Sequence, residues 1–489
     1  MLLSPLTERS KVGAVLAVLR AHWAFVVVLA AGVALRVVAA LGFRSVLWFN
    51  DSYDFLAVAN DPFPHPLRPS GYGLFLWALK PFHSLLLVTA LHHAAIVGIA
   101  IVGYRMLVRD FDVRRGWATL AVTPLLLDSY QIELEHLLLS DTLFTVLVLG
   151  ALLLLAKPGA TGWRRAAVVG VLLGFAAVTR TVGMPLFLIA VLYLLIRRTR
   201  WQAHAALAVA FLVPVGAYAT WYQQEHGRFA TSGTDGVFLW GRTAAFADCD
   251  AFTPPPDLER LCPNGKKGER LASSHQIWHE DSPLGWTNGE AFDDKTNQDA
   301  QRFALWAIRN QPGDYVKVVA YDFFVRTFSW NRSQYPTIGT EARYHFPTKP
   351  TARKPDLPVL GGRDRRSVVD EYAHGEAPLH IVEPYAGFMR GYQERVRVPG
   401  TVLGIVLLLG VAGIAWRRAR ARTALFWASA VTLLAIPPIT VDFDYRYILP
   451  ATPLACFAVA MAWGRRIPSE PAFETAEREK RPETQPARA

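Results

Sequence analysis

Residues 43–81 read FRSVLWFNDSYDFLAVANDPFPHPLRPSGYGLFLWALKP and form a polar loop between the first two strongly apolar segments of the chain. Two carboxylates, Asp51 and Asp54, stand three residues apart, so a helical conformation would place them on one face. A proline-rich turn follows, and then Arg68 and Tyr72 before the chain becomes apolar again. Because acidic and basic side chains gather here at the edge of an apolar segment, we interpret the loop as the candidate active site.

The composition of the chain is that of a membrane protein with several spans. Of its 489 residues, 52% are hydrophobic and only 19% are charged, which is too little charge to cover the surface of a soluble protein. The formal net charge is +11, but the arginines stand in short clusters at the ends of apolar segments. We therefore attribute the basic charge to membrane topology and expect no nucleic-acid partner.

Ten apolar segments are candidates for transmembrane helices. Several are shorter than the ~20 residues that a helix needs to cross a bilayer, so their ends must extend into the flanking polar residues or cross a thinned region. The segments are about 23–42, 84–104, 117–127, 142–156, 166–178, 184–196, 203–222, 400–416, 423–441 and 447–463.

The distribution of lysine and arginine orients these segments. Basic residues gather in every second connection, and the positive-inside rule places those connections in the cytoplasm. Both chain ends are then cytoplasmic, and the loops at 43–81, 128–141, 179–183, 223–399 and 442–446 lie outside. The basic connections contain Arg9, Lys11 and Arg20; Arg105, Arg109, Arg114 and Arg115; Lys157, Arg164 and Arg165; Arg197, Arg198 and Arg200; Arg417, Arg418, Arg420 and Arg422; and Arg465 and Arg466.

These assignments predict an all-α polytopic membrane protein of about ten transmembrane helices with a mixed extracytoplasmic domain. Residues 1–222 form an N-terminal transmembrane region that carries the catalytic external loops, and residues 223–399 form the extracytoplasmic domain. Residues 400–466 supply the C-terminal transmembrane helices. Residues 467–489 are polar and charged, which predicts a disordered cytoplasmic tail.

The extracytoplasmic domain contains two of the three cysteines. Cys249 and Cys262 flank a proline-rich loop and are close enough in sequence to form a disulfide in an oxidising compartment. Two free thiols are the alternative, and the sequence leaves both open.

Four arginines stand in or beside external loops, where the positive-inside rule expects few. An arginine near the membrane surface is costly to bury without a partner, so these four are candidates to bind an anionic ligand. Local pairing is the alternative. Arg446 would then pair with Asp442 or Asp444, and Arg36 with one of the two first-loop carboxylates. The four arginines are Arg36, Arg68, Arg180 and Arg446.

The second external loop, DSYQIELEHLLLSD, supplies further carboxylates. Glu133, Glu135 and Asp141 surround His136 in the sequence. Asp141 also stands where the N-cap of the fourth apolar segment is expected. Carboxylates of this kind can act as a base or bind a divalent metal. No spacing here is a specific metal motif, so we predict no metal ligand and no cofactor, with a divalent metal as the open alternative.

One chemistry uses both the carboxylates and the arginines. When a sugar is linked to a lipid through phosphate, the leaving group is already stable, and arginines suffice to hold and neutralise it. A single carboxylate then takes the proton of the attacking acceptor hydroxyl, which predicts inversion at the sugar. Glycoside hydrolysis would instead need two carboxylates at a set separation.

Five short motifs stand on the predicted outer side: NDSYDFLAVA (50–59), RPSGYGLFLWAL (68–79), LEHLLLSDTLF (134–144), VTRTVG (178–183) and DYRYILPATPL (444–454). In this order they resemble the GT-C superfamily of membrane glycosyltransferases, especially the branch of protein O-mannosyltransferases, lipid A aminoarabinose transferases and their actinobacterial relatives. The resemblance covers the membrane half of the chain and not residues 223–399.

The resemblance implies roles for individual residues. It implies that the first-loop acidic residue Asp51 is the catalytic base, with Asp54 as its partner, and that the four arginines hold the donor phosphate. Tyr72, Glu135 and Asp141 complete the predicted substrate-binding set. Many members of the family carry two adjacent acidic residues in this loop, whereas a serine follows Asp51 here. This departure leaves open which of the two carboxylates is the base.

The resemblance also implies a function. The chain would move a sugar from a polyprenyl-phosphate-linked donor to a cell-envelope glycan, lipid or protein at the outer face of a bacterial cytoplasmic membrane. The alternatives are a transporter or flippase of lipid-linked sugars and an inert scaffold of the same fold. Transporters usually contain repeated halves with broken helices, whereas this chain has polar loops on one side only.

Overall fold

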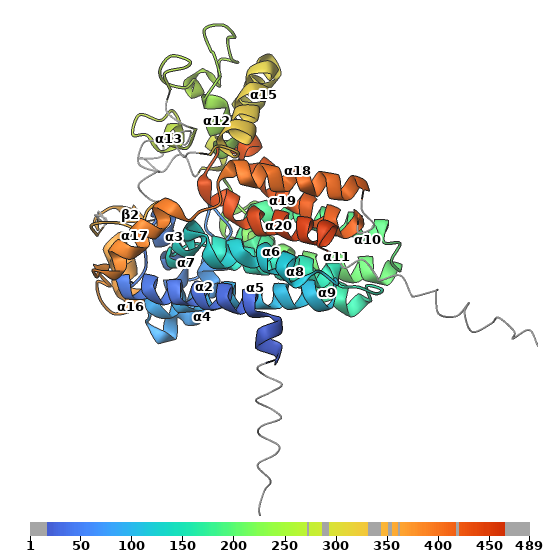
Figure 1. Ribbon diagram of the computed structural model, residues 1–489. Coiled ribbons are helices and arrows are strands. Elements are labelled where there is room, and N and C mark those ends of the chain that lie inside the picture. The colour runs from blue at the N-terminus through green and yellow to red at the C-terminus, as the bar shows by residue number, and fades with distance from the viewer. Residues whose placement is uncertain are drawn as a thin grey trace, which may run out of the picture.

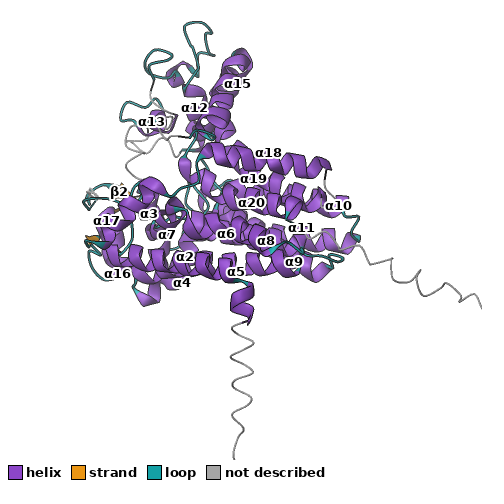
Figure 2. Ribbon diagram, in the orientation of Figure 1, coloured by secondary structure: helices purple, strands orange, loops and turns teal. Residues whose placement is uncertain are grey.

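A computed structural model describes residues 17–270, 273–285, 293–330, 344–350, 355–359, 362–416 and 420–464. Most of these residues are helical, and the strands among them are two residues long (Figure 2). The predicted tail at 467–489 and the basic residues Arg9, Lys11, Arg417, Arg418, Arg465 and Arg466 lie outside the described residues.

The helices of the N-terminal half are α2 (Trp23–Gly42), α3 (Asn50–Asn60), α4 (Gly71–Leu79), α5 (Leu85–Arg109), α6 (Arg115–Leu127), α7 (Ser129–His136), α8 (Asp141–Ala156), α9 (Trp163–Thr179), α10 (Met184–Ile196) and α11 (Trp201–His226). Those that follow are α12 (Asp235–Ala244), α13 (Ser273–Trp278), α14 (Asp294–Asn310), α15 (Pro312–Ala320), α16 (Arg365–Ala373), α17 (Tyr385–Arg395), α18 (Gly400–Trp416), α19 (Arg420–Thr440) and α20 (Ile448–Trp463). The strands are β1 (Phe43–Arg44), β2 (Pro358–Val359), β3 (Arg363–Asp364) and β4 (His380–Ile381).

Each of the ten predicted apolar segments coincides with a helix, and these helices form one bundle (Figure 1). Within the described residues, five helices are long and apolar enough to cross a membrane: α2, α5, α11, α19, and α20 with the turn before it. The pair α17 and α18, bent by 53°, would make a sixth. The chain is therefore a helical membrane protein, but the predicted count of ten spans is not supported.

The number of spans is smaller than predicted because several of the apolar helices are short. The helices α6, α8, α9 and α10 contain 13, 16, 17 and 13 residues. At a rise of ~1.5 Å per residue they are shorter than the ~30 Å of bilayer hydrocarbon. Hydropathy identified these segments correctly as helices, because they are apolar, but apolar character does not fix their length.

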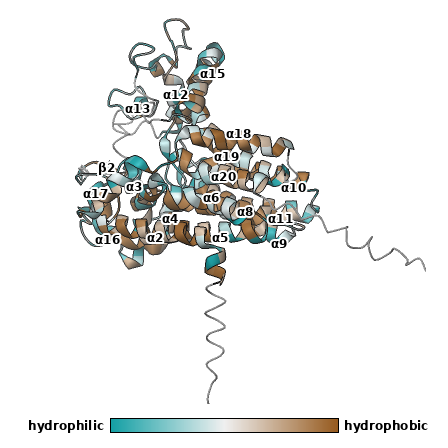
Figure 3. Cartoon of the chain, viewed as in Figure 1, coloured by the Kyte–Doolittle hydropathy of each residue, from teal (hydrophilic) through white to brown (hydrophobic). Residues whose placement is uncertain are grey.

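The arrangement of the bundle follows from where its apolar side chains lie. Helix α20, ILPATPLACFAVAMAW, is apolar on all faces and is buried against α6, α18 and α19, as expected for the core of a helical protein. Outer helices instead expose large apolar residues, among them Leu188 and Leu408 (Figure 3). Such an apolar exterior fits a lipid environment.

The polar loops gather at one end of this bundle, where α3, α7, α16 and α17 lie (Figure 1). Strand β1 directly follows α2 and pairs antiparallel with β4, with Phe43 opposite Ile381. Helix α16 packs on α3, and α17 packs on α2. Tyr344, Phe346 and Tyr372 join the hydrophobic core of the bundle. The later part of the predicted domain 223–399 is thus built into the polar end of the bundle.

The earlier part of that region forms a separate small helical unit, which comprises α12–α15 (residues 235–320). It has its own hydrophobic core around the fully buried Trp240 and Phe303. In Figure 1 it stands beside the polar end of the bundle. Cys249 and Cys262 form a disulfide within it. The predicted region 223–399 therefore contributes to two hydrophobic cores.

A buried ion pair fixes the small helical unit to the bundle. Arg242 on α12 pairs with Asp322 in the π-helical turn Tyr321–Arg326, and the side chains of Arg242 and Asp322 are 2% and 1% exposed. Arg242 also donates a hydrogen bond to the carbonyl of Pro438 in α19 over 3.3 Å. The hydroxyl of Tyr315 donates to the carbonyl of Ile439 over 3.0 Å. These hydrogen bonds hold the small helical unit against the end of α19.

We expect the disulfide to stabilise the small helical unit. Cys249 and Cys262 are separated by 13 positions, and closing a loop of this length contributes about 3 kcal/mol in the chain-entropy account. Replacing both cysteines with serine should raise amide hydrogen exchange in α12 and α14 of the intact protein and leave α5 unchanged. Unchanged exchange in α12 and α14 would show that the disulfide does not stabilise the unit.

Candidate functional site

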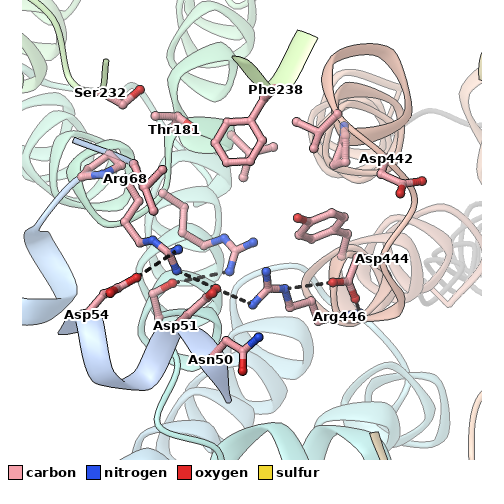
Figure 4. A pocket seen from close by; sticks show the side chains of 18 of the residues that line it. Asn50, Asp51, Asp54, Arg68, Thr181, Ser232, Phe238, Asp442, Asp444 and Arg446 are labelled. Atoms are coloured by element: carbon pink, nitrogen blue, oxygen red, sulfur yellow. Dashed lines mark hydrogen bonds and ion pairs between the residues drawn. The ribbon is translucent and has the colours of Figure 1, made fainter. Parts of the chain in front are cut away.

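A pocket of about 1360 Å³ lies between the polar end of the bundle and the small helical unit (Figure 4). Its walls come from α3, the start of α8, the turn after α9, the end of α19 and helices α12 and α13. Ligand pockets usually enclose roughly 300–1,000 Å³. This pocket is therefore larger than the usual site for a single small ligand.

Helix α3 presents two carboxylates to the pocket. Asp51 and Asp54 are three residues apart on this helix and share one face, while Tyr53, Leu56 and Ala57 on other faces are buried. Asp51 stands in the first turn, where a negative charge interacts favourably with the helix dipole. The sequence-based expectation that the two carboxylates share a helical face is thus met.

The serine between them, Ser52, has a structural role. Its hydroxyl accepts a hydrogen bond from the backbone N–H of Phe49 over 2.9 Å and donates to the carbonyl of Leu138 over 3.0 Å. Ser52 is fully buried, so an acidic side chain at this position would be buried beside a carbonyl oxygen. The serine that follows Asp51 thus has a structural role that an acidic residue could not take.

Two arginines converge on Asp51 (Figure 4). The Nη1 atoms of Arg68 and Arg446 lie 2.6 Å and 3.1 Å from the same oxygen, Oδ2 of Asp51. Arg68 also reaches Asp54, with 3.4 Å between Nη2 and Oδ2. Burial raises the pKa of Asp51, but the charges and hydrogen bonds of Arg68 and Arg446 outweigh it and hold this pKa far below the ordinary aspartate value. Asp51 is therefore ionised.

Arg446 is held by three further groups. Its Nε atom lies 3.4 Å from Asp444, and its guanidinium lies over the rings of Phe49 and Tyr447 at 4.8 Å and 5.5 Å. Tyr344 donates a hydrogen bond to Asp444. Burial and the charge of Asp444 raise the pKa of Tyr344 well above its ordinary value, so the phenol keeps its proton. The predicted pairing of Arg446 with Asp444 is found, together with the pairing with Asp51 that was not predicted.

The third arginine of the pocket is Arg180, in the turn after α9. Its Nη1 atom lies 2.5 Å from Oδ2 of Asp141, which is fully buried. The guanidinium stands between Phe144 and Tyr447, 6.0 Å and 5.5 Å from the ring centres. The N-cap role expected of Asp141 is wrong, because Ser140 occupies the N-cap and Asp141 belongs to the first turn of α8. The carboxylate of Asp141 positions Arg180 instead.

Three predicted site residues lie away from the pocket wall. Arg36 and Glu135 form a doubly hydrogen-bonded ion pair of 2.6 Å and 2.7 Å, with side chains 4% and 0% exposed. Arg36 also donates to the carbonyls of Gly32, Leu125 and Leu126. The predicted pairing of Arg36 with Asp51 or Asp54 is therefore wrong, because α7 brings Glu135 to α2. The predicted role of Arg36 at the donor phosphate has no support in this placement.

Tyr72 is the third of these residues. It is fully buried on α4, and its hydroxyl lies 3.2 Å from Nε2 of His92 on α5. Glu135 is also bonded to His93, with 2.7 Å between Oε2 and Nδ1. The predicted substrate-binding roles of Tyr72 and Glu135 thus have no support in their placement, since both side chains are engaged inside the bundle.

The five sequence motifs meet in this pocket. Each of them supplies at least one charged residue to its wall, although they are spread over about 400 residues of the chain. The residues are Asp51 and Asp54 from the first motif, Arg68 from the second, Asp141 from the third, Arg180 from the fourth, and Asp444 and Arg446 from the fifth.

Sequence reasoning missed several lining residues. Tyr344 comes from a region without a recognisable motif, so no local signal marked it. Phe238, Trp278 and Gln301 line the wall contributed by the small helical unit. Within the described residues, no group of three His, Cys, Asp or Glu side chains is placed to hold a metal ion. A divalent metal stays the alternative prediction, and adding a chelator to a transfer assay tests it.

No protein-family model and no curated protein matches this chain. It is similar to ArnT from Cupriavidus metallidurans, in a crystal structure with bound undecaprenyl phosphate, at a TM-score of 0.34 and 14% sequence identity over 89% of this chain and 76% of that chain. A likeness of this extent assigns no activity and no residue role to the present chain.

Proposed function

We propose that this protein is a glycosyltransferase of the GT-C type. It moves a sugar from a polyprenyl-phosphate-linked donor to a cell-envelope acceptor at the outer face of a bacterial cytoplasmic membrane. The observation that carries the proposal is the meeting of Asp51 and Asp54 with Arg68, Arg180 and Arg446 in one pocket at the polar end of an apolar bundle. The positive-inside distribution of basic residues supports an outer location for that end.

The arginines suit the donor phosphate. Arg68 and Arg446 approach each other through their shared partner Asp51, so both can donate to one phosphate group that enters the pocket. Arginine–phosphate contacts are charge-assisted and often bidentate. A phosphate held in this way leaves as a stable anion, so no general acid is needed. The polyprenyl chain would lie along the apolar exterior of the bundle.

The carboxylates of α3 suit the acceptor. One of them removes the proton from an acceptor hydroxyl, and the freed oxygen forms a bond to the anomeric carbon of the sugar. The bond between that carbon and the phosphate oxygen breaks, and its electron pair stays on polyprenyl phosphate. Phe238, Trp278 and Gln301, on the wall that the small helical unit contributes, offer aromatic and amide groups to an acceptor that carries hydroxyls. The sugar configuration inverts in this single displacement.

A transfer assay on the purified protein tests the proposal. It would offer a panel of radiolabelled polyprenyl-phosphate sugars together with a cell-envelope extract, with and without a chelator. We expect one donor class to give labelled product and polyprenyl phosphate to inhibit competitively, whereas polyprenol without phosphate does not inhibit. Arg68→Gln should weaken inhibition by polyprenyl phosphate about tenfold or more, because a charge-assisted contact is lost. Equal inhibition by polyprenol would contradict a phosphate site formed by arginines.

A further inference from the structure

His65, in the sequence Pro64–His65–Pro66, lies next to the carboxylate of Asp54. Its side chain is only 1% exposed, and its Nε2 atom faces Oδ1 of Asp54 across 3.7 Å. That nitrogen is buried and has no hydrogen-bond partner. A small rotation of the partly exposed Asp54 side chain would close the distance to a hydrogen bond.

The other ring nitrogen fixes the protonation state of His65. Nδ1 accepts a hydrogen bond from the backbone N–H of Leu67 over 3.2 Å, so its lone pair is occupied and cannot carry a proton. The single proton of a neutral imidazole must then be on Nε2. His65 is therefore an uncharged donor that points at Asp54.

The turn around His65 is held in place by hydrogen bonds. The hydroxyl of Ser70 accepts from the backbone N–H of His65 and donates to the carbonyl of Phe63, each over 2.9 Å. His226 of α11 lies 2.6 Å from the carbonyl of Pro64, and the N–H of Gly233 donates to the carbonyl of Pro66 over 2.8 Å. Because the imidazole is fixed, movement of Asp54 toward it is what completes the hydrogen bond.

The two carboxylates of α3 thus have different surroundings. Asp51 accepts from two guanidinium groups at 2.6 Å and 3.1 Å, and two positive charges so close oppose the uptake of a proton. Asp54 faces one guanidinium at 3.4 Å and the uncharged imidazole at 3.7 Å. A neutral donor orients a carboxylate through a hydrogen bond without placing a second positive charge beside it.

We propose that Asp54 is the base that takes the acceptor proton, that His65 is its positioning residue, and that Asp51 organises Arg68 and Arg446 for the donor phosphate. This division of roles rests on the proposed function. In the transfer step the acceptor O–H proton moves to the carboxylate of Asp54, while the new bond to the anomeric carbon forms and polyprenyl phosphate leaves with its electron pair. The assignment differs from the one that the family resemblance implies, in which Asp51 is the base.

Steady-state kinetics of Asp54→Asn and Asp51→Asn test the roles of the carboxylates, with polyprenyl phosphate binding measured on each preparation. We expect Asp54→Asn to lower kcat about 100- to 10,000-fold, the usual range for loss of a general base, with phosphate binding unchanged. Asp51→Asn should act mainly through a higher donor KM. Asp61→Asn, an exposed position just after α3, should match wild type.

The role of Asp54 is overturned if Asp54→Asn keeps kcat within tenfold of wild type, or if Asp51→Asn lowers kcat as much as Asp54→Asn does. A wild type that transfers no sugar at all would instead remove the proposed function. The two failures are therefore distinguishable.

His65→Leu and His65→Gln test the positioning role. Glutamine can place an N–H near the position of Nε2, whereas leucine cannot donate. We expect His65→Leu to lower kcat about 10- to 100-fold, as for loss of a hydrogen bond to a charged group, with donor KM unchanged and with His65→Gln close to wild type. Equal kcat values for the two variants would overturn the positioning role.

Discussion

Replacing Arg446 with glutamine is expected to lower kcat/KM about 100- to 1,000-fold, the effect typical of removing one donor to a developing negative charge in a closed site. Arg446 contacts Asp51 and Asp444 and lies over two aromatic rings. In the proposed reaction its guanidinium would donate to the phosphate as the anomeric bond breaks. Initial rates over a range of donor concentrations measure this effect.

Two further variants make the Arg446 prediction specific. Arg446→Lys keeps the charge but loses the planar pair of donors, so we expect an intermediate loss of about tenfold. Arg302→Gln removes an exposed arginine of α14 that pairs with Asp257 and Asp299, and such surface pairs contribute little. It should match wild type. An Arg446→Gln variant within about threefold of wild type would show that Arg446 does not act on the donor phosphate.

The second large effect concerns stability. Arg36→Met is expected to destabilise the protein by about 3–5 kcal/mol, because it leaves the fully buried carboxylate of Glu135 without its cation. The pair has two hydrogen bonds of 2.6 Å and 2.7 Å, and three backbone carbonyls also lose a donor. Unfolding of the purified protein in detergent, followed by tryptophan fluorescence, measures the loss.

The double variant Arg36→Met/Glu135→Gln shows whether the loss of stability comes from the broken ion pair or from poorer packing. Removing the charge of Glu135 removes the penalty for an unpaired buried carboxylate, so we expect the double variant to recover most of the lost stability. A double variant that is no more stable than Arg36→Met would contradict the ion-pair explanation and assign the loss to packing around α2.

The elements that the sequence predicted well are those set by local pattern. The range 23–42 coincides with α2, and the spacing of Asp51 and Asp54 places both on one face of α3, because a helix repeats every few residues whatever surrounds it. The five motifs likewise contain charged residues that line one pocket.

The errors concern contacts between distant segments. Arg36 was expected to pair with Asp51 or Asp54, yet its partner is Glu135, which lies 99 positions away. Tyr344 reaches Asp444 across 100 positions. Such pairings depend on how α2, α7 and the segment after the small helical unit pack together, and a single sequence contains no local signal for that packing.

The most direct test of the central claim is the stoichiometry of the reaction. Purified protein in liposomes would receive a labelled polyprenyl-phosphate sugar and acceptor, and free polyprenyl phosphate and glycosylated acceptor would be counted together with donor moved across the bilayer. We expect equal amounts of the two products from wild type and neither from the Asp51→Asn/Asp54→Asn double variant. Intact donor moved across the bilayer, without release of polyprenyl phosphate, would contradict a transferase and identify a transporter.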